Sequence, residues 1–236
     1  MKKSILFSSI ATTCCLLIQH SASAGWNYNE SDRLEAGMNG LYLVSNTNEW
    51  GSNSVALYKE GAESRSSSEF GLNTFQSSSI VSSHGADISS DTCTSKETAQ
   101  IIFAITEASN INLNFYCRGS GGWINLGSHG ESSSGIWFQL DRQDIAIGSA
   151  WNMVASTGAG GHASKNYPSY QSGGSETFYL IPGPFNYRIL IEISNESHGN
   201  MSDAETSFNM SLTPVPSPAA SALLAIAGLV SRRRRA

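Results

Sequence analysis

The feature that most constrains the fold is an alternation of apolar and other side chains, which recurs in short segments from about residue 98 onward. Residues 111–117 place Ile, Leu, Phe and Cys at every second position, with Asn or Tyr between them. Similar runs occupy residues 101–105, 136–140, 187–193 and 208–212. A period of two residues puts successive side chains on opposite faces of an extended chain, so one face can be buried. These segments therefore predict β-strands.

Turn residues separate these segments, and no stretch has the periodicity of a convincing amphipathic helix. Ala108 and Ser109 suit a hairpin turn between strands at 101–107 and 110–117. Further strands are expected at residues 74–81, around Ile145 and Ile147, and at 178–181 before Pro182-Gly183-Pro184. Seven to nine short strands of this kind predict an all-β fold, a single antiparallel β-sandwich or jelly-roll-like domain.

Residues 25–70 are less regular and rich in Asn, Ser and Glu. Strands are expected near 40–45 and 54–59, and a loop at 64–68. The segment either begins the same sandwich or forms an irregular N-terminal extension. No internal repeat is visible, which argues against a propeller or solenoid.

The N-terminus has the layout of a cleavable secretory signal. Lys2 and Lys3 precede an apolar stretch at residues 5–18, and Ala22 and Ala24 fit the small-x-small pattern at a cleavage site. Residues 1–24 are therefore predicted to direct export through the Sec translocon and to be removed. The β-sandwich would then occupy residues 25–216, as an ectodomain.

The C-terminus combines a short motif, an apolar run and a basic end. The apolar run at 219–230 would cover roughly 18 Å as a helix, against a hydrocarbon core of about 30 Å. It predicts a short hydrophobic helix that enters the inner membrane only transiently. The motif and the basic cluster are formed by Val215, Pro216, Ser217, Pro218, Arg232, Arg233, Arg234 and Arg235.

This tail resembles a PEP-CTERM sorting signal, with Ser217 where Glu is usual. The resemblance implies a protein of an exopolysaccharide-producing Gram-negative bacterium. It also implies a membrane-inserted precursor that an exosortase-like enzyme processes. The resemblance covers the tail only, with residues 217–236 as the sorting segment, so it implies an address at the cell surface or in the extracellular matrix, not an activity. The alternative is a plain tail anchor.

The charge of the chain changes when both ends are set aside. The whole sequence has 14 basic and 19 acidic residues, a net charge of −5. Six basic residues lie in the two ends, so residues 25–216 hold eight basic and all 19 acidic residues, a net charge of −11. Such an acidic body argues against a nucleic-acid partner, which needs a basic face.

Cys93 and Cys117 are the cysteines outside the signal segment. An even pair in an oxidising compartment predicts a disulfide, which would stabilise the fold by roughly 3 kcal/mol in the loop-entropy model. The alternative is two separate buried thiols.

No set of residues predicts catalysis. The histidines at 84, 129, 162 and 198 lack metal-ligand spacing, and no G-x-S-x-G elbow is present. Asp141 and Asp144 after a strand fit turn chemistry better than a glycosidase pair. No cofactor or metal site is therefore predicted, although calcium is possible on loop carboxylates, namely Asp87, Asp91, Asp141 and Asp144.

Aromatic side chains are the better indication of binding. Trp137 is out of phase with Ile136 and Phe138, so it would lie on the solvent face, where it could stack on a sugar ring. Trp123 is a second candidate, and the alternative is that both belong to the core or its rim. Three hypotheses follow: a structural or interaction protein of the exopolysaccharide matrix, a carbohydrate-binding module, and, third, a secreted hydrolase. The first is favoured, and the protein is predicted not to be an enzyme.

Overall fold

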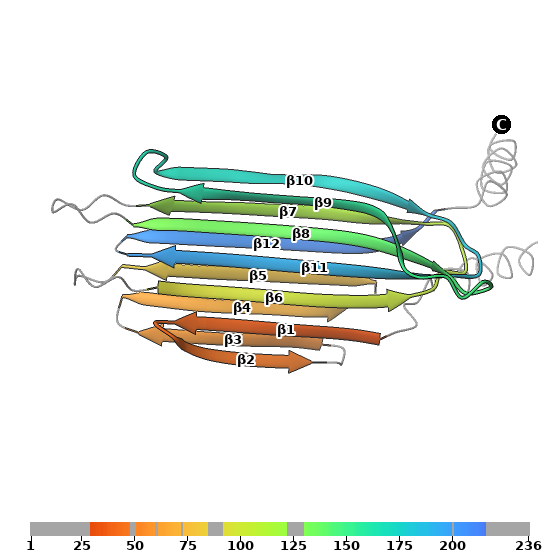
Figure 1. Cartoon of the computed structure of the whole chain (residues 1–236), viewed down its shortest axis with the longest axis horizontal. Helices are drawn as coiled ribbons and strands as arrows, with labels where there is room; N and C mark the ends of the chain where they lie inside the picture. The colour runs from red at the N-terminus through yellow and green to blue at the C-terminus, as the bar shows by residue number, and fades with distance from the viewer. Residues whose placement is uncertain are drawn as a thin grey trace, which may run out of the picture.

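A computed structural model describes residues 29–47, 51–59, 61–71, 73–84, 92–121, 130–199 and 201–215. These residues form twelve β-strands (Figure 1). The strands are β1 (Asn29–Met38), β2 (Leu41–Thr47), β3 (Gly51–Lys59), β4 (Ala62–Gly71), β5 (Thr74–Ser83), β6 (Thr92–Phe103), β7 (Ser109–Gly121), β8 (Glu131–Asp144), β9 (Asn152–Ala163), β10 (Ser169–Leu180), β11 (Phe185–His198) and β12 (Ser202–Pro214). Within this described part of the chain, no helix is long and apolar enough to cross a membrane.

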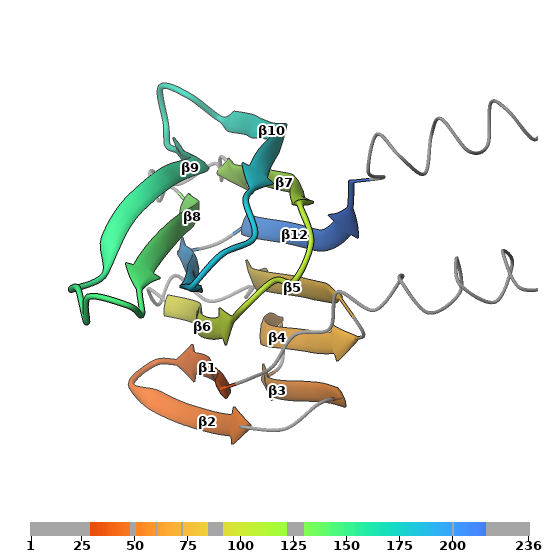
Figure 2. The ribbon, with the colours of Figure 1, turned by 90° about the vertical axis from the view of Figure 1, so that its right-hand side faces the viewer.

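The strands form two antiparallel sheets of six. Sheet A has the order β2-β1-β6-β11-β8-β9, and sheet B has the order β10-β7-β12-β5-β4-β3. The sheets face each other, with β1 against β4, β11 against β12, and β9 against β10 (Figure 2). The all-β sandwich expected from the sequence is therefore confirmed.

Strands β5 to β12 have the arrangement of an eight-stranded jelly roll. Four of the six strands of each sheet come from this unit, in the orders β5-β12-β7-β10 and β6-β11-β8-β9. Within β5 to β12, the chain passes between the sheets at every connection except the one between β8 and β9, which are neighbours in sheet A. Most of the pairing is consequently between segments far apart in the sequence.

The N-terminal strands extend both sheets of this jelly roll. The β1–β2 hairpin adds to sheet A beside β6, and the β3–β4 hairpin adds to sheet B beside β5. Asn39 and Gly40 connect β1 and β2 with positive φ angles of 50° and 81°, as a tight hairpin turn requires. Strands were expected near 40–45 and 54–59, and β2 and β3 lie there. The segment at 64–68, expected as a loop, is instead part of β4.

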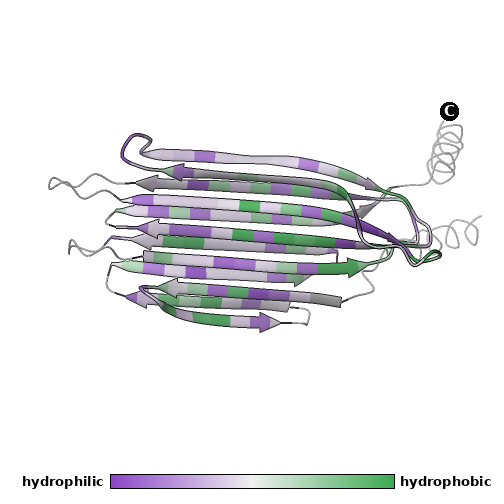
Figure 3. Cartoon of the chain, in the orientation of Figure 1, coloured by the Kyte–Doolittle hydropathy of each residue, from purple (hydrophilic) through white to green (hydrophobic). Residues whose placement is uncertain are grey.

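The main core lies between the jelly-roll strands of the two sheets. Alternate residues of β6, β7, β8, β11 and β12 point inward, and Figure 3 shows the resulting hydrophobic bands along the strands. Phe138 is at its centre, with its ring centroid 5.6 Å from that of Phe178 and 6.4 Å from that of Phe208. The period-two pattern of the sequence thus identified the buried face correctly.

The hairpin expected around Ala108 and Ser109 is wrong. The preceding strand, β6, belongs to sheet A, and the following strand, β7, belongs to sheet B. The connection therefore crosses from one sheet to the other. Two strands that each have one apolar face can pair side by side in one sheet or pack face to face across the core. Alternation of side chains alone therefore could not distinguish a hairpin from a crossing between the sheets.

The predicted disulfide between Cys93 and Cys117 is also wrong. Both are buried thiols and they are not joined. Cys93 is the second residue of β6 and packs with the small cluster around Met38 and Val81, whereas Cys117 belongs to the main core. The alternative of two separate buried thiols describes the structure.

The strand expected around Ile145 and Ile147 is also absent from the described residues. These residues form the turn after β8, and both side chains are exposed. Asp144 stabilises this turn, since its Oδ1 accepts a hydrogen bond from the backbone N–H of Ala146 at 3.0 Å. The strands are also longer and more numerous than the expected seven to nine short ones.

The predicted signal with Ala22 and Ala24, and most of the predicted sorting tail, lie outside the described residues. Val215 is the last described residue of the motif. Its backbone N–H donates to the carbonyl of Ala108 at 2.8 Å, which ties the end of β12 to the connection before β7. The export and sorting predictions therefore stay predictions.

Candidate functional site

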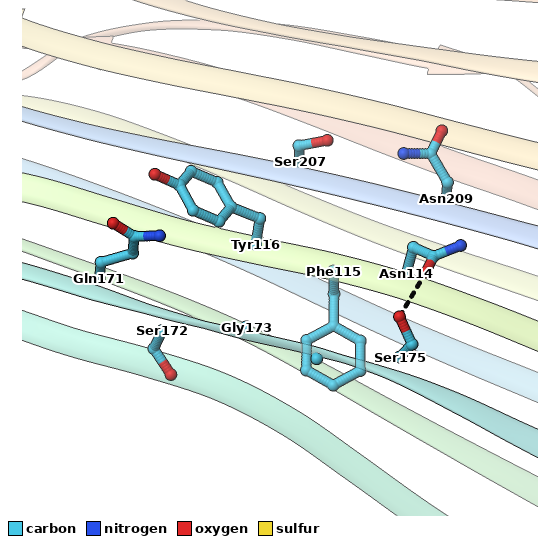
Figure 4. Close-up of a pocket in the computed structure, with 10 residues that line it drawn as sticks. Asn114, Phe115, Tyr116, Gln171, Ser172, Gly173, Ser175, Ser207 and Asn209 are labelled. Carbon is cyan, nitrogen blue, oxygen red and sulfur yellow. Dashed lines mark hydrogen bonds between the residues drawn. The ribbon is translucent and has the colours of Figure 1, made fainter.

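A shallow open groove crosses the outer face of sheet B over β7, β10 and β12 (Figure 4). Its lining consists of amide, hydroxyl, aromatic and glycine residues, with no charged side chain. The residues are Asn114, Phe115, Tyr116, Gln171, Ser172, Gly173, Gly174, Ser175, Ser207 and Asn209. The groove thus offers neutral hydrogen-bonding groups beside one outward-facing phenol ring.

Two adjacent glycines let β10 lie close to β7 in this groove. A Cβ on Gly173 would lie 2.5 Å from the carbonyl oxygen of Phe115 and 3.1 Å from the Cα of Tyr116. A Cβ on Gly174 would lie 3.2 Å from the Phe115 ring on the core side. Because Gly173 has no side chain, the floor of the groove at this position is bare backbone, and the space above it is open to a ligand.

The polar side chains of the groove come from the outward phase of three strands. On β7 these are Asn114 and Tyr116, and on β12 they are Ser207 and Asn209, directly across the pairing with β7. The Ser175 hydroxyl on β10 donates to Asn114 Oδ1 at 2.6 Å. This bond orients the amide of Asn114 so that its N–H groups remain available to a ligand.

A second hollow continues this polar surface toward β3. It is lined by residues of β3, β4, β5 and β12 and shares Ser207 and Asn209 with the first groove. Its outward side chains include Ser54, Ser67 and Gln76. The two hollows therefore form a polar strip of mainly hydroxyl and amide groups across the strands of sheet B, and Glu69 is the one charged residue in the lining of the second hollow.

Charged groups border the first groove at one end. Arg118 on β7 pairs with Glu205 on β12, with Nη2 and Oε2 2.5 Å apart. The hydrogen bond and charge of Glu205 raise the pKa of the Arg118 guanidinium. Asp203 accepts a hydrogen bond from Ser120 in the same region. Arg118 and Glu205 balance each other and Asp203 is held by Ser120, so none of these charged side chains lines the groove itself.

Trp137, the aromatic candidate from the sequence, lies on the opposite side of the molecule. It is on the outer face of sheet A and is 39% exposed, as its phase predicted. It faces Gly158 on β9 and Glu192 on β11 in the sheet pairing. Trp123, the second candidate, lies outside the described residues. The structure therefore does not bring Trp137 into the groove.

The groove residues were missed because no single one is distinctive. The sequence does contain signals for them: Asn112, Asn114 and Tyr116 occupy the outward phase of their strand, and a Gly-Gly pair interrupts a later one. Glycine inside a strand often marks a close backbone approach. What the sequence lacked was the adjacency of β7 with β10 and β12.

The acidic candidates have structural partners. Asp141 is buried, and its Oδ2 accepts hydrogen bonds from Arg188 Nε at 2.9 Å and Nη2 at 2.5 Å. Asp144 stabilises the turn after β8, while Asp87 and Asp91 lie outside the described residues. In the described ranges, no group of three or more His, Cys, Asp or Glu side chains is placed to hold a metal ion.

No protein-family model matches the chain, and no curated protein matches it. Among solved structures, Eiger TNF from S. frugiperda is similar at 10% identity over 50% of this chain and 68% of that one, with a TM-score of 0.22. TmCBM61 in complex with β-1,4-galactotriose is similar at 7% identity over 70% and 88%, with a TM-score of 0.23. At these low TM-scores, neither similarity assigns a family or a ligand to this chain.

Proposed function

We propose that this chain is an exported, non-catalytic carbohydrate-binding protein of the cell surface or extracellular matrix, and that it holds a neutral glycan on the outer face of sheet B. The observation that carries the proposal is the open groove across β7, β10 and β12, lined only by neutral residues. Export and sorting by Sec and an exosortase-like enzyme rest on the two ends of the sequence.

The chemistry of the groove suits a polyhydroxylated ligand. A sugar hydroxyl both donates and accepts hydrogen bonds, and so do the amides of Asn114, Gln171 and Asn209 and the hydroxyl of Ser207. The Tyr116 ring adds an apolar surface on which the C–H face of a sugar can rest. A charged ligand would find no opposite charge in the lining.

The open shape of the groove also fits a polymer. A chain lying across the strands could continue from the first groove into the second hollow, because Ser207 and Asn209 line both. An exopolysaccharide could thus be held along the sheet without a deep pocket. This arrangement supports a binding role within a matrix, which also accommodates the structural role expected from the sequence.

Binding to an array of neutral glycans, followed by titration calorimetry on the strongest, tests the proposal. We expect Tyr116→Ala and Asn209→Ala each to weaken binding about tenfold, equivalent to about 1.4 kcal/mol. Tyr58→Ala is the matched control, since Tyr58 is an exposed tyrosine on β3 that lines neither hollow. Its affinity should be unchanged.

Two results would contradict this assignment. Loss of binding in Trp137→Ala, with Tyr116→Ala unaffected, would move the site to sheet A. An absence of binding to every neutral glycan tested would remove the carbohydrate-binding function and leave the interaction role without a glycan.

A further inference from the structure

Two carboxylates are buried together between the sheets, in the half of the sandwich built by the N-terminal strands. Asp32 on β1 is 2% exposed and Glu97 on β6 is 0% exposed. In the β1–β6 pairing, Asp32 faces Ala99 and Leu34 faces Glu97, so the two acids are diagonal neighbours on the inner face of sheet A. Side chains at such positions can reach each other.

Sheet B covers these acids with hydroxyl groups. Ser68 on β4 donates to Asp32 Oδ2, and Ser77 on β5 donates to Glu97 Oε2. Ser66 on β4 also contributes, with its Oγ 3.4 Å from Glu97 Oε2. Serine at inward positions where a sandwich normally places aliphatic residues gives this half of the interior a polar lining.

An amide completes the enclosure from β3. The side chain of Asn53 lies with Nδ2 3.4 Å from Asp32 Oδ2, while its Oδ1 accepts a hydrogen bond from Ser45 at 2.5 Å. We term Asp32, Glu97, Ser66, Ser68, Ser77 and Asn53 the acidic box. It is made entirely of oxygen-bearing side chains from five strands.

The hydrogen bonds leave half of each carboxylate unsatisfied. Asp32 Oδ1 and Glu97 Oε1 are fully buried and have no hydrogen-bond partner. In the described ranges, the ion pairs of Asp and Glu with Arg or His involve other acids, namely Glu35, Glu63, Asp141, Glu196 and Glu205. A buried, unpaired carboxylate costs several kcal/mol, so two together need compensation.

We propose that the acidic box binds a hard divalent cation, calcium, between Asp32 and Glu97. Two carboxylates balance a double positive charge, and their unsatisfied oxygens supply the first ligands. The hydroxyls of Ser66, Ser68 and Ser77 supply further neutral oxygens. Calcium takes six to eight oxygen ligands in flexible geometry, and the box contains no nitrogen or sulfur ligand that would favour zinc.

Such an ion would be captured during folding, since both acids are enclosed by the two sheets. Ligands from β1, β4, β5 and β6 come together only when the N-terminal hairpins join the jelly roll. The cation would therefore fasten β1 and β3–β4 onto the sandwich, and its binding energy would contribute to folding. This site is separate from the groove, which lies on the outer face of sheet B.

The test uses the purified protein unfolded in EDTA and refolded with or without calcium chloride. After gel filtration, elemental analysis should find about one calcium per chain in the calcium sample. Its thermal midpoint should exceed that of the metal-free sample by roughly 5–10 °C when calcium is well above its dissociation constant. A parallel refolding with magnesium chloride tests the choice of ion.

The variant Asp32→Asn/Glu97→Gln keeps the shape of the box and removes its charge. It should bind no calcium and show the same thermal midpoint in EDTA and in calcium. Glu192→Gln, at an exposed carboxylate on β11, is the control and should retain the calcium-dependent shift. The proposal is overturned if the unmodified protein refolds without bound calcium, if magnesium replaces it equally, or if the double variant keeps the shift.

Discussion

Arg188 and Asp141 form a partly buried, two-point ion pair on adjacent strands of sheet A. Nε and Nη2 of the guanidinium lie 2.9 and 2.5 Å from the same carboxylate oxygen, Oδ2. The guanidinium carbon also lies 4.7 Å from the centroid of the Trp151 ring. This arrangement joins β11, β8 and the segment leading into β9.

Asp141→Asn should therefore lower stability. The neutral amide cannot balance Arg188, whose side chain is only 24% exposed, so we expect a loss of about 2–4 kcal/mol in the free energy of unfolding. Urea denaturation measures it. Removal of the Glu63 carboxylate, whose pairing with Arg65 is more exposed to solvent than the Arg188–Asp141 pair, should cost less than about 1 kcal/mol. Equal losses in the two variants would contradict a structural role for the buried pair.

The acidic box predicts an unusual pH dependence in EDTA. Burial raises the pKa of Asp32, and burial together with the charge of Asp32 raises the pKa of Glu97 well above its usual value. Both groups thus bind protons more tightly in the folded chain. The stability that they contribute is fully present below the unfolded-state pKa values near 4 and is lost as pH rises through the folded values.

Denaturant titrations in EDTA at several pH values from about 4 to 8 measure this effect. Stability of the unmodified protein should fall more steeply with rising pH than that of Glu97→Gln. Identical slopes for the two proteins would show that Glu97 does not titrate in the folded chain over this range. Calcium should suppress the decline at high pH, because it takes the place of the protons.

The aromatic centre of the core predicts a large loss of stability when Phe138 is truncated and a small one when its neighbour Trp137 is truncated. Phe138→Ala removes a fully buried ring that stacks with Phe178 and lies near Phe208, and should cost about 3–5 kcal/mol. Trp137→Ala, one residue away on the outer face, should cost less than half as much. A reversed order in thermal or urea unfolding would contradict the inward phase of β8.

The two thiols predict a clear labelling result. Cys93 and Cys117 are both buried, and burial raises the pKa of the Cys117 thiol. Without reductant, an alkylating reagent should modify neither in the folded protein and both after unfolding in denaturant. Peptide mass analysis assigns the sites. A peptide pair linked through Cys93 and Cys117 would contradict the separate positions of the two residues.

The sequence predicted which side of each strand faces the core better than it predicted which strands pair with each other. Trp137 was placed outward and Phe138 inward, and both are found so. The pairing of β6 was predicted incorrectly, because its real neighbours are β1 and β11, the latter almost a hundred residues further along the chain. The Cys93–Cys117 bridge was predicted from the even number of cysteines, which carries no information on where the two thiols lie in the fold.

For the candidate site, too, the sequence indicated which residues face outward on one strand but not which strands lie beside it. Tyr116 and Asn114 were recognisable as outward residues of a strand, but the groove needs Gln171 and Ser175 on one side and Ser207 and Asn209 on the other. The acidic box is a stronger case. Asp32 shares the inward phase of its strand with Leu34 and Ala36, and Glu97 shares that of its strand with Ala99 and Ile101. A carboxylate is nevertheless rarely buried, so this phase alone did not indicate that the two acids lie between the sheets.

The sequence by itself determined the all-β fold class of this protein. The period-two alternation makes extended strands with one apolar face, and such faces must pack on one another. The two ends of the sequence also predict export and sorting to the cell surface or the extracellular matrix. Only the tertiary structure decided which strands pair, which sheet each joins, and which polar groups meet. Side-chain alternation records whether a residue faces inward, whereas the neighbour across the sheet is set by contacts between segments distant in the chain.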